Sequence, residues 1–309
     1  MPTNLHSYRY RVVDVFTQHA LEGNQLAVFP DSSGIDDLTM QKIAKELNLS
    51  ETVFIAPAMR QDCAVSVRIF TPTRELRFAG HPTIGASFIV LDERIVPADR
   101  ANFILEEKIG PVPIRVESGD NGRPLIWLTT PPIHFGASFE RELCAQALGI
   151  AVDDILDAPP ETVSAGNPFV YVPLRDKDAV DRAWFDSSGA KLLKHANHDP
   201  MCLFVFTPTA GGAYSRMFAP GFGVAEDPAT GSGTGPLAAY MMRHGLISSA
   251  AGTRFVSEQG TKMGRRSILH VLINGEKGAD GIEVGGYVSP IVEATMTLPA
   301  LGHPVAQLS

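Results

Sequence analysis

Three short segments of this 309-residue chain occur twice, in the same order. The first copies at residues 22–29, 68–72 and 81–85 and their matches at 165–172, 216–220 and 227–231 read "EGNQLAVF" and "AGNPFVYV", "RIFTP" and "RMFAP", "HPTIG" and "DPATG". Equivalent residues, such as Asn24 and Asn167, lie 143, 148 and 146 residues apart. An ordered set at a nearly constant offset indicates two similar halves packed around a pseudo-twofold axis.

Both halves show the same kinds of expected elements. Strand-like runs such as "VSVRIF", in which Val65, Val67 and Ile69 share one face, accompany one segment that is apolar nearly all round. These apolar segments, residues 83–95 and 235–247, are typical of buried helices, with Pro236 suited to a first helical turn. We therefore predict an α+β fold with two pseudo-symmetric domains, each a curved sheet or barrel around a buried central helix.

Amphipathic and outer helices complete the expectation. In residues 36–48 the apolar side chains recur at helical spacing, and Asp36 or Asp37 can cap the start. Further helices are expected at 139–148 and 177–195. The chain is long enough for two domains, which we place at 1–130, completed by a strand within 290–309, and at 131–289.

Composition excludes several classes of function. The net charge is −8 and no basic cluster exceeds "GRR", which argues against nucleic acid and anionic membranes as partners. The N-terminus lacks a charged start followed by an apolar run, and no stretch reaches about 18 apolar residues. Three scattered cysteines without a C-x-x-C pair favour a reducing compartment, and we expect a cytoplasmic protein.

The stretch "EDPATGSGTGPLAAY", residues 226–240, matches none of three well-known glycine-containing motifs. A dinucleotide fingerprint needs a third glycine where Pro236 stands, a phosphate loop needs a lysine, and a nucleophile elbow needs glycine where Thr230 stands. What remains is a glycine-rich start of a buried helix, where free N–H groups and the helix dipole favour a small anion such as a carboxylate. The alternative is that the glycines only permit tight packing and that Ser232 or Thr234 only caps the helix.

Three side chains are candidate proton-transfer groups. Glu51 lies between a helix end and an apolar strand, where desolvation would raise its pKa; the alternative is an exposed turn residue. His81 and Asp227 each stand just before an expected helix, and their alternatives are a packed turn histidine and a capping aspartate. His195 and His198 have the spacing of metal ligands but lack a third partner in sequence, so no metal site is expected.

At these residues the sequence resembles the PhzF-like family of phenazine-biosynthesis proteins. The resemblance rests on "VVDVFT", "LEGNQLAVF", "IAKELNLSETVFI", "RIFTPTRELRFAGHPTIGA", "EDPATGSGTGPLAAY" and "SEQGTKMGR", and extends from about Tyr10 to Gly286. It implies the diaminopimelate-epimerase-like fold, a catalytic cleft between the domains, a homodimer, and isomerisation of a dihydro-hydroxyanthranilate without a cofactor.

The resemblance also implies roles for individual residues. Glu51 would be the general acid–base, and His81, Asp227 and Ser232 would bind substrate and assist proton movement. Gly80, Gly231 and Gly233 would lend backbone N–H groups to a substrate carboxylate. From their positions in the sequence, Asn24 and Ser50 are further expected substrate contacts; the alternatives are a turn role for Asn24 and hydrogen bonds to local backbone for Ser50.

The sequence departs from relatives of this fold in two places. Racemases and epimerases of the fold use one catalytic cysteine from each half, whereas Cys63, Cys144 and Cys202 lie outside both motifs, which excludes a two-thiol mechanism. "GRRS", residues 264–267, stands where many relatives have a proline, and we expect only a local turn there. An epimerase with another pair of bases and a non-catalytic small-anion binder remain alternatives to the isomerase.

Overall fold

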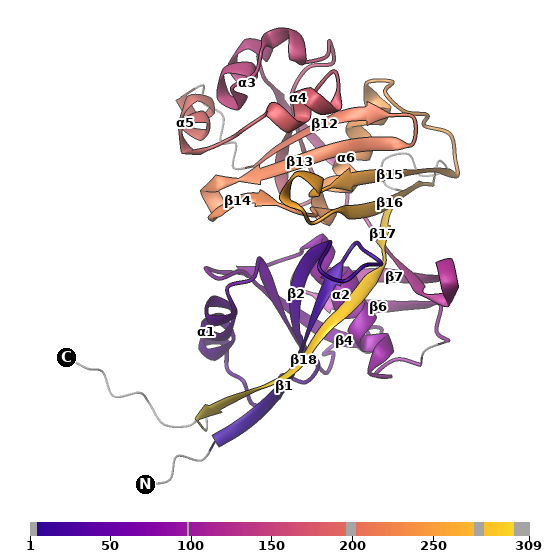
Figure 1. Ribbon diagram of the computed structural model, residues 1–309. Helices are drawn as coiled ribbons and strands as arrows, with labels where there is room; N and C mark the ends of the chain where they lie inside the picture. The colour runs from indigo at the N-terminus through magenta and orange to yellow at the C-terminus, as the bar shows by residue number, and fades with distance from the viewer. Residues whose placement is uncertain (1–4, 98, 196–201, 275–280, 300–309) are drawn as a thin grey trace, which may run out of the picture.

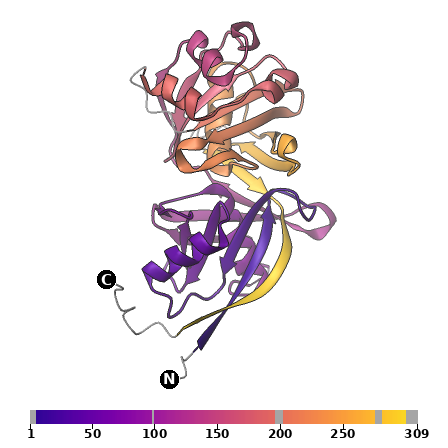
Figure 2. The same cartoon turned by 60° about the vertical axis from the view of Figure 1, so that its left-hand side comes forward.

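A computed structural model of the chain describes residues 5–97, 99–195, 202–274 and 281–299. It shows two lobes, one built mainly from the first half of the chain and one from the second (Figure 1). The division is equally plain when the molecule is turned (Figure 2). None of the described helices is long and apolar enough to cross a membrane.

The described residues of the first half form eight strands and two α-helices: β1 (Leu5–Val15), β2 (Asn24–Phe29), α1 (Asp37–Leu47), β3 (Glu51–Ala56), β4 (Val65–Phe70), β5 (Glu75–Leu76), α2 (Gly80–Asp92), β6 (Asn102–Glu107), β7 (Gly110–Ser118) and β8 (Pro124–Thr129).

The second half begins with β9 (His134–Ser138) and α3 (Arg141–Leu148). It continues with β10 (Glu161–Ser164), β11 (Pro168–Pro173), α4 (Lys177–Arg182), α5 (Ser187–His195), β12 (Leu203–Thr209), β13 (Gly212–Ala219), β14 (Val224–Asp227), α6 (Gly231–Arg243), β15 (Thr253–Gln259), β16 (Ser267–Ile273), β17 (Ile282–Gly286) and β18 (Val288–Pro299).

The two halves share one topology. In the first, β2 is parallel to β3 and β4 to β6, whereas β3–β4 and β6–β7 are antiparallel. In the second, β11 is parallel to β12 and β13 to β15, whereas β12–β13 and β15–β16 are antiparallel. The internal repeat is therefore a repeat of strand order, and the predicted pair of pseudo-symmetric α+β units is confirmed.

An additional strand completes the sheet of each half. The last strand, β18, crosses to the first lobe and pairs antiparallel with β1 along its whole length (Figure 1). Its counterpart β9 pairs with β10. Between the halves, β8 pairs with β17, so that the sheet is continuous through both lobes.

The repeated "R-x-F" motif makes the same local contacts twice. Arg68 Nε donates to Glu75 Oε1 at 2.8 Å, and its guanidinium lies 5.1 Å from the ring centre of Phe70. Arg216 Nε donates to Glu226 Oε1 at 2.8 Å, and its guanidinium lies 4.8 Å from the ring centre of Phe218. The motif thus anchors the strand before each central helix by an ion pair and a cation–π contact.

The helices largely follow expectation, with three corrections. Asp36 caps α1 as predicted, accepting from the Thr39 backbone N–H. The expected helix at 177–195 is interrupted between α4 and α5. The central helices begin at Gly80 and Gly231, three and four residues earlier than predicted, so that Pro236 lies inside α6. The first turn of α6 contains Gly231, Gly233 and Gly235, and glycine is a weak helix signal.

The starts of the two central helices touch. A side-chain carbon placed on Gly80 would lie only 2.5 Å from the Gly231 carbonyl carbon and from the Ser232 backbone nitrogen. Only a residue without Cβ allows this approach, because both obstacles are backbone atoms. The glycine therefore decides how closely the two halves meet.

We predict that Gly80→Ala destabilises the protein. The added methyl group must push α2 away from α6, an overpacking cost of about 1–3 kcal/mol that exceeds the gain in helix propensity. Thermal unfolding of the variant should show a lower midpoint than wild type. Gly211→Ala is the control, because a Cβ there has no neighbour within 4 Å. Equal midpoints for Gly80→Ala and wild type would contradict the close-contact interpretation.

A second buried feature accompanies α2. Glu107 ends β6 with 5% exposure, and the Thr83 hydroxyl donates to its Oε1 at 2.6 Å. Its Oε2 has no hydrogen-bond partner among the described residues. Burial raises the pKa of Glu107 to about 8, although the Thr83 hydrogen bond lowers it. The folded protein therefore holds this carboxyl protonated at neutral pH.

Glu107→Gln should stabilise the protein at alkaline pH. The unfolded carboxyl ionises near pH 4.5 and the folded one near pH 8, so wild type loses stability relative to the variant across that interval. The difference in unfolding free energy should grow with pH to a few kcal/mol above pH 8. Chemical denaturation at pH 5 and pH 9 measures it, and Glu46→Gln on the exposed face of α1 is the control. A difference that does not change with pH would refute the protonated state.

Candidate active site

Four polar side chains from separate elements meet where the two halves join. Asn24 begins β2, Glu51 begins β3, His81 is the second residue of α2, and Asp227 ends β14. His81 thus lies within its helix rather than before it as predicted. Asn24 and Glu51 lie near each other because the parallel strands β2 and β3 begin at the same edge of the sheet.

Glu51 and His81 form the first contact of the site. Glu51 Oε2 lies 3.3 Å from His81 Nε2. The His81 side chain is 5% exposed and that of Glu51 16%. Both atoms are buried, and neither has a well-aligned hydrogen-bond partner in the part of the chain that the structure describes. Such orphaned polar atoms are costly in a folded protein unless they serve a ligand or a reaction.

Asn24 links the halves. Its side-chain nitrogen lies 2.9 Å from Asp227 Oδ1, 2.9 Å from the Ala229 carbonyl oxygen and 3.2 Å from His81 Nδ1. An amide nitrogen carries two hydrogens, so these three contacts compete. Asn24 is only 1% exposed, and its amide nitrogen bridges His81 of the first half to Asp227 and Ala229 of the second.

Two residues outside the predicted set hold Asp227. Thr230 Oγ1 donates to Asp227 Oδ2 at 2.5 Å. Gln259 Nε2 donates to the Asp227 carbonyl oxygen at 2.7 Å and to Thr230 Oγ1 at 3.0 Å, and its Oε1 accepts from the Thr230 backbone N–H at 3.1 Å. Gln259 lies in the family motif "SEQGTKMGR", but it is uncharged and 32 residues from Asp227 in sequence. Nothing in the sequence therefore indicated that it contacts Asp227.

Burial separates the pKa values of the ionisable groups. Burial and, to a smaller extent, the charge of Asp227 raise the pKa of Glu51 to about 8. Burial also raises the pKa of Asp227 to about 6, although hydrogen bonds from Thr230 and Asn24 lower it. Burial lowers the pKa of His81 to about 3, although a backbone hydrogen bond with Gln25 acts to raise it. At neutral pH the site therefore holds a protonated Glu51, a neutral His81 and an ionised Asp227.

The predicted backbone contacts are only partly available. Gly80 and Gly231 face each other, so their first role is close packing. Gly233 is a correction: its N–H donates to the Thr230 carbonyl oxygen at 3.0 Å and cannot serve a ligand. Ser232, in the first turn of α6, is half-buried and its hydroxyl has no partner among the described residues. Ser50, half-buried, precedes β3 directly.

The repeat places a thiol where the first half has Glu51. Phe70 of β4 is opposite Thr52, and Phe218 of β13 is opposite Leu203, so the residues just before Thr52 and Leu203 are equivalent. They are Glu51 and Cys202. Burial and, to a smaller extent, the charge of Asp227 raise the pKa of Cys202 to about 12, so this thiol is protonated at neutral pH.

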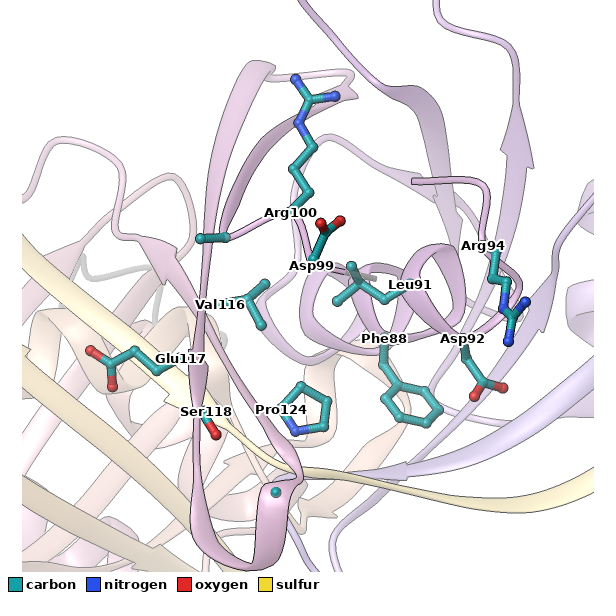
Figure 3. Close-up of a pocket in the computed structure, with 12 residues that line it drawn as sticks. Phe88, Leu91, Asp92, Arg94, Asp99, Arg100, Val116, Glu117, Ser118 and Pro124 are labelled. Atoms are coloured by element: carbon teal, nitrogen blue, oxygen red, sulfur yellow. The ribbon is translucent and has the colours of Figure 1, made fainter. Parts of the chain in front are cut away.

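A surface hollow of about 550 Å³ lies elsewhere in the first half. It is lined by Phe88 and Leu91 at the far end of α2 and by charged residues such as Arg94 and Glu117 (Figure 3). None of the four meeting side chains lines it. It is therefore separate from the candidate site.

No metal site emerges from the described part of the chain, which contains no suitable group of three histidine, cysteine or acidic side chains. His198 and the side chain of His195 lie outside the described residues. Cys63, Cys144 and Cys202 are free thiols.

Comparison with known proteins places this arrangement in a family. The chain matches the phenazine biosynthesis-like family (PhzC-PhzF) over residues 13–293. It is 34% identical over 288 residues to a trans-2,3-dihydro-3-hydroxyanthranilate isomerase of Pseudomonas aeruginosa, covering 90% of this chain and 95% of the relative.

Solved structures share the fold. A PhzF-family protein of Bacillus anthracis superposes with a TM-score of 0.82 at 23% identity, covering 94% of this chain and 99% of the other. A hydroxyproline epimerase of Agrobacterium vitis superposes with a TM-score of 0.67 at 13% identity, covering 96% and 92%. The chain therefore belongs to the PhzF family and is an isomerase with the diaminopimelate-epimerase-like fold.

Proposed function

We propose that this isomerase moves a proton between carbon atoms of a small cyclic carboxylate, with Glu51 as the general acid–base. The observation that carries the proposal is the buried, unpartnered Glu51 Oε2, 3.3 Å from His81 Nε2. A carboxyl with a pKa of about 8 can both take and return a proton near neutral pH.

The reaction needs no outside reagent. The Glu51 carboxylate takes a proton from one substrate carbon, the C–H electron pair moves into the conjugated system, and the carboxyl returns the proton to another carbon. Oxidation state is unchanged, so no redox cofactor is required. Neutral His81 beside Glu51 can accept a hydrogen bond from the protonated carboxyl and orient it between the two steps.

The start of α6 supports a carboxylate substrate. The N–H groups of Gly231 and Ser232 are at the positive end of a 13-residue helix, and the half-buried Ser232 hydroxyl adds a third donor. The P. aeruginosa relative is named for trans-2,3-dihydro-3-hydroxyanthranilate. That compound is a small cyclic carboxylate, and we propose it or a close analogue as substrate.

The epimerase alternative requires a second base on the opposite face of the substrate. Asp227 is the ionised candidate, but both of its carboxylate oxygens accept hydrogen bonds, from Asn24 and Thr230. Burial lowers the pKa of His81 to about 3, which makes its imidazole a weak base, and the Cys202 thiol stays protonated. These contacts favour one shuttling carboxyl over two opposed bases.

We further propose a cytoplasmic homodimer that binds neither nucleic acid nor membranes. The net charge of −8 and three free thiols support the location and the excluded partners. The family resemblance supports the dimer.

Glu51→Gln should slow isotope exchange strongly. Wild type incubated with trans-2,3-dihydro-3-hydroxyanthranilate in D₂O should introduce deuterium at carbon, and the isosteric amide should slow this by about 10²–10⁴-fold, because an amide cannot accept the proton. Proton NMR of the substrate follows the exchange.

Glu46→Gln is the control, since Glu46 is exposed on α1. Equal exchange by Glu51→Gln and wild type would assign the chemistry to another base. Binding of the substrate by both proteins without any exchange would instead identify a non-catalytic binder.

The rate should depend on pH through Glu51. The free enzyme is active as a base only when Glu51 is ionised, and that fraction increases with pH up to its pKa of about 8. We expect kcat/KM for isotope exchange to rise about tenfold per pH unit below pH 7 and to level off above about pH 8. A profile that is flat between pH 6 and pH 8 would refute the raised pKa of the base.

A further inference from the structure

Arg265 connects the two halves beside the site. Its guanidinium contacts four acceptors in the first half: the carbonyl oxygens of Leu21 (3.3 Å), Glu22 (2.8 Å) and Gly23 (2.8 Å), and Asp14 Oδ1 (2.7 Å). Asp14 is 1% exposed and also accepts from the Leu21 N–H at 2.7 Å. The expectation of a mere local turn at "GRRS" was therefore wrong, because its partners are about 250 positions earlier in the chain.

The backbone around residues 21–23, whose carbonyl oxygens accept hydrogen bonds from Arg265, is conformationally strained. Phe16 and Leu21 have φ values of 65° and 70°, in the left-handed region that residues other than glycine rarely adopt. Leu21 is 70% exposed, so its own packing cannot hold it. Such geometry persists only where surrounding contacts determine it. The Arg265 and Asp14 hydrogen bonds are the contacts that do so at Leu21.

Residues 21–23 lead directly into the candidate active site. Gly23, whose carbonyl oxygen accepts from Arg265 Nε, also donates its N–H to the Arg266 carbonyl oxygen at 3.1 Å. The next residue is Asn24, whose side chain contacts Asp227 and His81. Both peptide groups of Gly23 are thus tied to the second half, immediately before the residue that joins the two halves of the site.

We propose that Arg265 is a positioning residue for proton transfer: by fixing the peptide of Gly23, it places the Asn24 amide between His81 and Asp227. The proposal rests on the proposed function in that it assigns Arg265 to the same reaction. Arginine suits this role because its planar fork serves several acceptors at fixed angles, which a lysine ammonium cannot do. Arg265 touches no reacting atom and acts through Asn24.

Arg265→Lys is the test variant, because it keeps a cation beside buried Asp14 and so preserves the fold while losing most of the hydrogen bonds. Arg266→Lys is the matched control: Arg266 pairs with Glu258 of its own half and is half exposed. Isotope exchange should slow about ten- to a hundredfold in Arg265→Lys, with the loss in kcat rather than in KM, and stay unchanged in Arg266→Lys.

A double-mutant cycle with Asn24→Ala separates positioning from general stability. If Arg265 acts through Asn24, then Arg265→Lys slows exchange less than twofold once Asn24 is alanine. Losses that multiply in the double variant would overturn the proposal, as would an unchanged kcat in Arg265→Lys.

A readout without substrate keeps this inference separable from the proposed function. NMR of protein labelled with ¹⁵N-histidine, with the His81 signal assigned through His81→Gln, should show that signal shifted by Arg265→Lys and not by Arg266→Lys. If wild type exchanges no substrate, the proposed function fails and this shift still decides the role of Arg265. An unmoved His81 signal overturns it.

Discussion

The exclusion of water from the point where α2 and α6 begin is the constraint on which the site depends. Glu51, His81 and Asp227 would have ordinary pKa values in water. Burial raises the pKa of both carboxyls and lowers that of the imidazole, so that at neutral pH Asp227 is ionised while Glu51 and His81 are uncharged. The Gly80–Gly231 contact makes that burial possible because it lets the halves approach to backbone distance.

The two halves share one backbone framework but place different functional groups at equivalent positions. The strand order, the arginine over phenylalanine and the buried central helix occur in both halves. The equivalent positions before Thr52 and Leu203 nevertheless hold a carboxyl in one half and a thiol in the other. One half therefore contributes Glu51, the proposed proton shuttle, and the other contributes Asp227 and the start of α6. This division fits an isomerase with a single shuttling group.

Particular residues show why prediction succeeded or failed. Glu51, His81 and Asp227 are found in sequence because each is ionisable and stands beside a short motif. Gln259, Thr230 and Arg265 were not found, because their roles consist of hydrogen bonds to partners that the sequence does not place near them. Gly233 was wrongly offered as a free donor, since the local hydrogen bond of its N–H depends on where α6 begins.

The sequence by itself determined the repeat, the α+β class, the central apolar helices and the ionisable residues of the site, because these depend on local pattern and residue type. Only the tertiary structure decided which atoms meet. The Asn24 bridge, the desolvation of Glu51 and the grip of Arg265 on Gly23 each join residues that are distant in the chain. Burial and hydrogen-bond geometry are properties of the packed molecule, and no local pattern of residues encodes them.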